Sequence, residues 1–169
     1  MIVTEHSIRA IIETIPAIRI NDSLSIKPSF GWGDKTELSR YLQKKGGSAY
    51  PLIWLLPSAD DYSAFGQEVD KDCVFIIATR ETRTDMYNDE RYINAFATVL
   101  NPLTAKLIHG LTVSTISDLS SEDWTINKFP NYAEADKNYT IDLWDATQLT
   151  ISVRFNNTSD CLKAISYGV

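Results

Sequence analysis

The feature that most constrains the fold is a strictly alternating segment near the end of the chain. Its apolar residues are Leu149, Ile151, Val153 and Phe155, and its polar residues are Gln148, Thr150, Ser152 and Arg154. Successive side chains of a β-strand point to opposite faces, so this pattern predicts a strand over 147–155 with one apolar and one polar face. The apolar face requires a second layer of secondary structure to cover it.

The longest helical pattern in the chain can supply that layer. Its apolar residues recur at steps of three and four: Tyr92, Phe96, Leu100, Leu103, Leu107 and Leu111. This spacing lines one face of a helix, and we expect that face to pack against the alternating strand. Pro102 lies inside the pattern and is expected to kink the helix.

The first half of the chain predicts two further helices and a hairpin. Isoleucines at 8, 11, 12 and 15 line one face of a helix that ends at Pro16, and residues 18–26 alternate around an Asn-Asp-Ser turn. Asp34 and Glu37 have the spacing of a helix cap, and Gly46 can end the short helix that follows. Residues 31–33, Gly-Trp-Gly, are interpreted as a turn.

Two near-continuous apolar runs, 50–56 and 73–79, are typical of strands covered on both faces, and 124–129 predicts one more strand. No linker or repeat divides the chain. We therefore expect one α+β domain over residues 1–169. Its antiparallel or mixed β-sheet would be flanked by an N-terminal helix, a short helix and one long helix.

Charge and composition narrow the functional classes. The chain has 169 residues, 16 Lys and Arg against 22 Asp and Glu, and a net charge of -6. Its basic residues are scattered in the sequence, which disfavours wrapping around nucleic acid. Charges interrupt the N-terminal isoleucines and the longest apolar run, 52–56, is short, so we expect neither export nor a membrane segment. Cys73 and Cys161 are expected to be free thiols.

The chain lacks a recognisable catalytic or metal-binding motif. His6 and His109 have no acidic or cysteine partner at ligand spacing, and neither glycine cluster matches a phosphate-binding loop. Asp60, Asp61 and Glu68 belong to an acidic segment, 58–72, that we interpret as a solvated loop. An acid/base role for these three carboxylates in a small enzyme remains an alternative. We expect a protein without enzymatic activity, cofactor or metal.

Aromatic residues outside the strongest core patterns are the best candidates for contacts with partners. They are Trp32, Tyr62, Phe65, Tyr87, Tyr132, Tyr139 and Trp144. Aromatic side chains are enriched at protein interfaces, although each of these could instead fold onto the domain's own core. The candidate interface set is Tyr62, Phe65, Trp32, Arg80, Arg83 and Tyr87. Tyr62 and Phe65 would anchor a projecting arm formed by 58–72, and the strand 147–155 would accept a neighbour's strand.

The order and character of several segments resemble the tail terminator and tail-completion proteins of long-tailed bacteriophages. The segments are YPLIWLLPS (50–58), CVFIIATRET (73–82), NDERY (88–92) leading into NPL (101–103), and IDLWDA (141–146). Together they span most of the chain.

The resemblance implies a small α+β subunit of a virion structural ring, six-fold in known members, assembled in the bacterial host. Such a ring caps the tail tube, stops its polymerisation and joins the tail to the head connector. Its expected partners are copies of itself, the tail tube protein and a neck protein. DNA would pass through the lumen without specific binding. Another head–tail joining role, in head closure or tube initiation, is the alternative.

Overall fold

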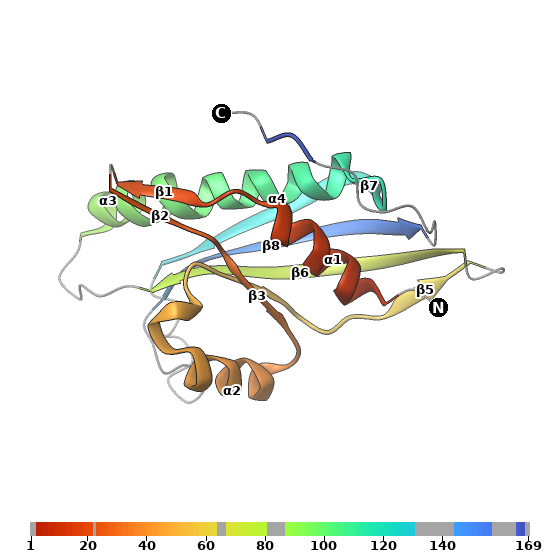
Figure 1. Ribbon diagram of the computed structural model, residues 1–169, viewed down its shortest axis with the longest axis horizontal. Coiled ribbons are helices and arrows are strands. Elements are labelled where there is room, and N and C mark those ends of the chain that lie inside the picture. Colours follow the sequence, from red (N-terminus) through yellow and green to blue (C-terminus); the bar gives the residue numbers. More distant parts are fainter. Residues whose placement is uncertain are drawn as a thin grey trace.

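The computed structural model describes residues 3–21, 23–63, 67–80, 87–130, 144–156 and 165–167. These residues form a single α+β domain with a mixed, mainly antiparallel sheet, as the sequence predicted (Figure 1). The main sheet has the strand order β3-β4-β6-β8-β7, and β5 pairs with one end of β6. Phe65, Arg83, Tyr132, Tyr139 and Cys161 lie outside the described residues.

Two long strands form the centre of the sheet. β6 (Glu68–Arg80) and β8 (Trp144–Asn156) pair antiparallel along their whole length, from Glu68 opposite Asn156 to Arg80 opposite Trp144. β7 (Ser117–Phe129) pairs antiparallel with the other side of β8. The alternating strand is therefore internal, so our prediction that it accepts a neighbour's strand is wrong.

The opposite half of the sheet is made of shorter strands. β4 (Leu52–Leu55) pairs antiparallel with β6, and β3 (Ser29–Trp32) pairs parallel with β4. Because Gly31 and Trp32 belong to β3, our interpretation of 31–33 as a turn is wrong for these two residues. Gly31 pairs with Trp54 of β4, and a Cβ at position 31 would lie 2.3 Å from Cζ3 of the Trp54 ring. The ring crosses β3 at this position, which therefore requires a glycine. β3 and β7 are thus the terminal strands of the described sheet, and the three-residue β5 leaves a further short edge beside β6.

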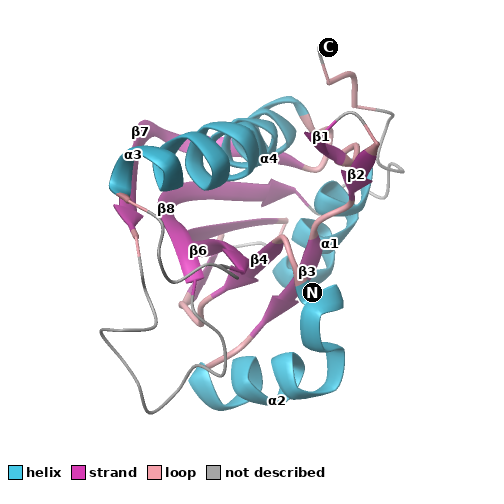
Figure 2. Cartoon of the chain, turned by 90° about the vertical axis from the view of Figure 1, so that its left-hand side faces the viewer, coloured by secondary structure: helices cyan, strands magenta, loops and turns pink. Residues whose placement is uncertain are grey.

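One face of the sheet is covered by α1 (Thr4–Thr14) and by a long helical rod (Figure 2). The rod consists of α3 (Asn88–Arg91), the π-helix η2 (Tyr92–Leu100) and α4 (Asn101–Val113). The predicted packing is confirmed, because the apolar residues of β8 and of the rod share one buried cluster. Beside Pro102 the backbone hydrogen bonding changes, and Asn101 N–H donates to the carbonyl of Phe96, five residues back.

Among the described residues, the other face is covered only at one end, by α2 (Lys35–Lys45) and the 3₁₀ turn η1 (Gly46–Ala49). Asp34 caps α2 as predicted, accepting hydrogen bonds from the backbone N–H groups of Thr36 and Glu37 at 2.8 and 2.9 Å. Trp144 is fully buried in this second cluster and donates from Nε1 to Tyr50 Oη. Of the two alternatives for Trp144, contact with a partner or packing on the domain's own core, the second holds, because α2 covers the part of β8 that precedes the alternating pattern.

The remaining elements are two hairpins. β1 (Ile18–Asn21) and β2 (Leu24–Ile26) form the predicted N-terminal hairpin. β5 (Asp60–Tyr62) pairs with Val69, Asp70 and Lys71 of β6, so most of 58–72 belongs to the sheet and not to a solvated loop. The strand predicted at 73–79 begins at Glu68.

No helix among the described residues is both long and apolar enough to cross a membrane.

Candidate interaction site at the β3 edge

The predicted interface residues do not form one surface. Tyr62 and Tyr87 are exposed, 43% and 81%, Arg80 is exposed, and Trp32 is half-buried. Tyr62 lies opposite Val69 near one end of β6, while Arg80 is the last residue of that strand. At about 3.3 Å per residue, these two positions are separated by roughly 35 Å. Of the described candidates, Trp32 lies in a well-formed hollow.

This hollow, the β3 groove, has a volume of about 560 Å³ and follows the open edge of the sheet. Strand β3 contributes its floor together with Trp54 of β4, and α1 and α2 contribute its walls. Its lining residues are Arg9, Phe30, Gly31, Trp32, Gly33, Glu37, Arg40, Tyr41, Lys44 and Trp54.

The floor of the β3 groove is aromatic and held in place by defined contacts. The rings of Phe30 and Trp32 lie 5.7 Å apart, and those of Tyr41 and Trp54 lie 5.4 Å apart. Nε1 of Trp54 donates to the carbonyl of Gly33 at 2.9 Å. The guanidinium carbon of Arg9 lies 4.5 Å from the centroid of Trp32. These contacts preorganise the floor before any partner binds.

The rim of the β3 groove is basic. Arg9, Arg40 and Lys44 line it against one carboxylate, Glu37, which accepts a hydrogen bond from Arg40 at 2.7 Å. An adjoining hollow shares Arg9, Phe30 and Tyr41 and adds Lys27, Lys45 and Glu13. The two hollows therefore gather five of the 16 basic residues of a chain whose net charge is -6.

This clustering corrects the view that the basic residues are scattered. Arg9, Lys27 and Arg40 are distant in the sequence, and only the packing of α1, β3 and α2 brings them together. The available sequence signal was the spacing of Arg40 and Lys44, which places both on one face of α2.

The backbone of β3 is directed into the β3 groove at alternate residues. Ser29 N–H donates to Pro51 O at 2.8 Å and Gly33 N–H donates to Leu55 O at 3.1 Å, both toward β4. Alternation along a strand then directs the polar backbone groups of Phe30 and Trp32 away from β4. The β3 groove thus offers backbone pairing, an aromatic floor and a basic rim.

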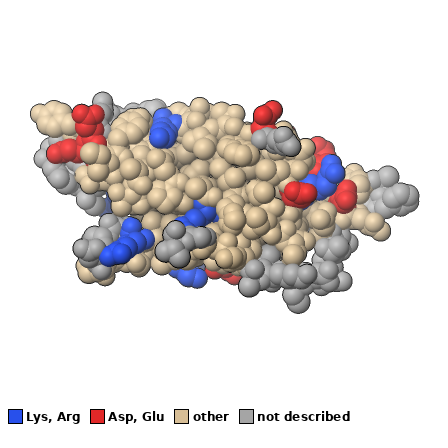
Figure 3. All heavy atoms as spheres, turned by 90° about the horizontal axis from the view of Figure 1, so that it is seen from above, with Lys and Arg blue, Asp and Glu red and all other residues tan. Residues whose placement is uncertain are grey.

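The second open edge of the sheet, β7, has a different character. Trp124 and Ile126 are 45% and 42% exposed, and Asp118 and Asp123 are exposed. The pairing with β8 is interrupted, since Leu119 lies opposite Val153 and Trp124 opposite Ile151. A bulge at 120–123 therefore separates two regular parts of β7. Viewed over α4, most of the visible surface is uncharged, and separate basic and acidic groups lie in its middle as well as toward its two ends (Figure 3).

The carboxylates considered as acid/base residues do not converge. Register places Asp60 opposite Lys71 and Asp61 opposite Asp70, so Asp60 and Asp61 point to opposite faces of the sheet. Asp60 accepts hydrogen bonds from Lys71 Nζ at 2.5 Å and from Thr4. Glu68 lies 3.9 Å from Arg154.

Lys71 is a charged residue on the apolar face of β6, with 2% of its side chain exposed. Burial alone would lower the pKa of Lys71, but the hydrogen bond to Asp60 and the charge of Glu5, 3.3 Å away, outweigh it, and the pKa is raised. On the opposite face, the bidentate hydrogen bond from Arg154 lowers the pKa of Asp70. These groups stabilise the strands by pairing.

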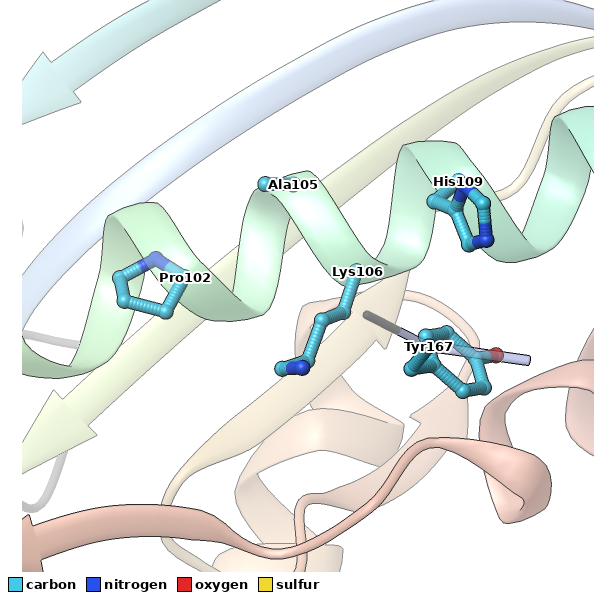
Figure 4. A pocket seen from close by; sticks show the side chains of 5 residues that line it. All are labelled: Pro102, Ala105, Lys106, His109 and Tyr167. Carbon is cyan, nitrogen blue, oxygen red and sulfur yellow. The ribbon is translucent and has the colours of Figure 1, made fainter. Parts of the chain in front are cut away.

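A smaller hollow of about 320 Å³ lies where the C-terminal segment crosses α4 (Figure 4). His109 Nε2 lies 2.9 Å from Ser166 O, and Tyr167 Oη lies 2.8 Å from Thr14 Oγ1 of α1. Lys106 lies 5.7 Å from the Tyr167 ring. The contacts fasten residues 165–167 to two helices, which gives this hollow a structural role.

Among the described residues, no group of three or more His, Cys, Asp or Glu side chains is arranged to bind a metal ion. No model of a known protein family matches the chain, and a search of curated proteins finds no significant match.

Proposed function

We propose that this chain is the subunit of a closed homo-oligomeric ring in the tail or neck of a long-tailed bacteriophage. The ring, a hexamer by resemblance, caps the tail tube, stops its polymerisation and joins the tail to the head connector. The role is structural, and DNA passes through the lumen without being bound.

The observation that carries this proposal is that the two terminal strands of the described sheet, β3 and β7, have open edges of unlike chemistry. The β3 edge lies in a basic, aromatic groove, and the β7 edge carries exposed apolar and acidic residues. A long exposed edge with apolar side chains is avoided in proteins that remain monomeric. Contacts between unlike surfaces produce closed rings when the rotation between subunits closes.

Two further features support a structural role. The α+β architecture, with helices packed on a mixed sheet, agrees with the fold implied by the resemblance. Asp60, Lys71, Asp70 and Arg154 pair with one another within the sheet, as expected for residues that stabilise it.

Native mass spectrometry and electron microscopy of the purified protein test the ring directly, and a stable monomer across the micromolar range would contradict it. The tail role is tested with the tail tube protein of the same phage, polymerised in vitro. Adding this chain should arrest tube growth and leave a ring at one tube end. Tubes that grow to the same lengths with and without the chain would exclude the terminator role.

A further inference from the structure

We propose that the β3 groove is the receptor for strand β7 of a second copy of this chain. The contact joins residues 124–129 of one subunit to the β3 edge of the next, so that neighbouring sheets continue one another. This inference rests on the proposed ring and names the contact that builds it.

The backbone supplies the first argument. Phe30 and Trp32 direct their polar backbone groups into the groove, and β7 is the terminal strand at the opposite end of the described sheet. Adding a strand to an open edge forms a row of main-chain hydrogen bonds without rearranging either sheet. Because the two edges differ, the contact is head-to-tail, as a ring requires.

The lengths of the two edges also match. The bulge at 120–123 ends the regular pairing of β7 on one side, and the strand then runs without interruption from Trp124 to Phe129. This regular part has six residues, and β3 has four. A short segment of β7 is therefore sufficient to cover the β3 edge completely.

The side chains of the two edges are complementary. The groove has an aromatic floor with Arg9, Arg40 and Lys44 at its rim. The β7 edge carries exposed Trp124 and Ile126, with the exposed carboxylate of Asp123 directly before them. The basic residue of this segment, Lys128, has its ammonium over the rings of Tyr92 and Phe96, at 5.7 and 5.8 Å from their centroids. An apolar centre surrounded by opposite charges is the arrangement of a specific protein interface.

The two tryptophans of the groove are poorly placed to bind nucleic acid by stacking. Trp32 already has Arg9 over it, and Trp54 is 2% exposed and donates a hydrogen bond to the carbonyl of Gly33. Base stacking requires exposed aromatic faces. Covering the groove with a neighbouring subunit would also remove its positive charge from a lumen through which DNA slides.

Charge reversal tests the contact. K44E changes an exposed residue of the groove rim, and D123K changes the proposed entering strand. Each variant alone should require about tenfold or more higher concentration for half-assembly, because like charges then face each other. K35E is the matched control, since Lys35 lies on the same helix outside the groove and the charge change is equal.

Mixing the two variants provides the sharper measurement. In a ring where K44E and D123K subunits alternate, the groove with reversed charge always receives the strand with reversed charge. The unchanged groove likewise receives the unchanged strand, so opposite charges meet at every head-to-tail contact. Native mass spectrometry should then show rings with equal numbers of each variant, and unchanged thermal melting of each variant would show that both fold. Wild-type-like assembly of K44E, or no rescue on mixing, would overturn this contact while the wild-type ring still stands. A wild-type protein that forms no ring would instead overturn the proposed function, and this contact with it.

Discussion

The guanidinium carbon of Arg9 lies 4.5 Å from the centroid of the Trp32 ring, and this contact ties helix α1 to the edge strand β3. A cation over an aromatic ring contributes about 0.5–1 kcal/mol at a partly exposed site. We expect a double-mutant cycle of Arg9→Met and Trp32→Leu, followed by urea unfolding, to give a coupling free energy in this range. A coupling free energy of zero would mean that the two side chains pack independently.

The buried ammonium of Lys71 is stabilised mainly by the carboxylate of Asp60. Asp60→Asn removes the carboxylate 2.5 Å from the buried ammonium, whereas Glu5→Gln removes one 3.3 Å away. Leaving a buried charge with one weaker partner is expected to lower the free energy of unfolding by about 2 kcal/mol, against less than about 1 kcal/mol for Glu5→Gln. Denaturant titration of both variants measures the difference. Equal losses would show that the ammonium is held by neither carboxylate in particular.

The buried thiol of Cys73 is expected to lower the free energy of unfolding at high pH. The thiol is free and buried, and burial raises its pKa from an ordinary 9.0 to about 12. Between these values the unfolded chain releases the thiol proton while the folded chain retains it, so the free energy of unfolding falls as pH rises. The fall attributable to Cys73 amounts to at most about 4 kcal/mol across this interval. Cys73→Ala should show a shallower decline, and identical slopes would contradict the assignment.

The apolar face of β8 should not tolerate charge. Leu149 is fully buried opposite Phe75, and Leu149→Asp is expected to cost several kcal/mol, enough to abolish cooperative melting. Val153 is a weaker test, because it lies opposite Lys71, which could pair with an introduced carboxylate. Thr150→Asp, on the half-exposed face of the same strand, is the control and should melt normally. A folded Leu149→Asp protein would refute the packing.

Tyr62 tests whether the β5–β6 hairpin takes part in assembly. Its ring is 43% exposed, so Tyr62→Ala is expected to change the free energy of unfolding by less than about 0.5 kcal/mol. If the hairpin contacts the tail tube, as we expect, the variant binds tubes less well although it still forms rings. Gln67→Ala, at a neighbouring exposed position, serves as control. Tube binding equal to that of the wild type would exclude Tyr62 from this contact.

Local patterns predicted much of the fold. The alternation from Leu149 to Phe155 and the cap at Asp34 each depend on residues close in sequence, and both are confirmed. β3 was missed because Gly31 has the composition of a turn, and only the Trp54 ring, which crosses the strand, explains a glycine there. The sequence left both alternatives open for Trp144, because the helix that covers it lies about 100 residues earlier in the chain.

The candidate site was less predictable than the fold. Trp32 was predicted as an interface residue from its residue type alone. Its partner Arg9 belongs to a helix that was predicted from its isoleucines, and this pattern gives no information about the polar face. The parallel pairing of β3 with β4 brings the groove residues together, and a parallel register leaves no short-range pattern in the sequence.

The bulge at 120–123 has a further consequence for the free subunit. A flat strand edge acts as a template on which further chains can stack without limit, the geometry that leads to fibres. In β7 the regular edge is restricted to 124–129, and the acidic residue Asp123 stands at its start. The same irregularity that defines a short docking strand would therefore act as a gatekeeper, keeping unassembled subunits from aggregating through the surface they need for assembly.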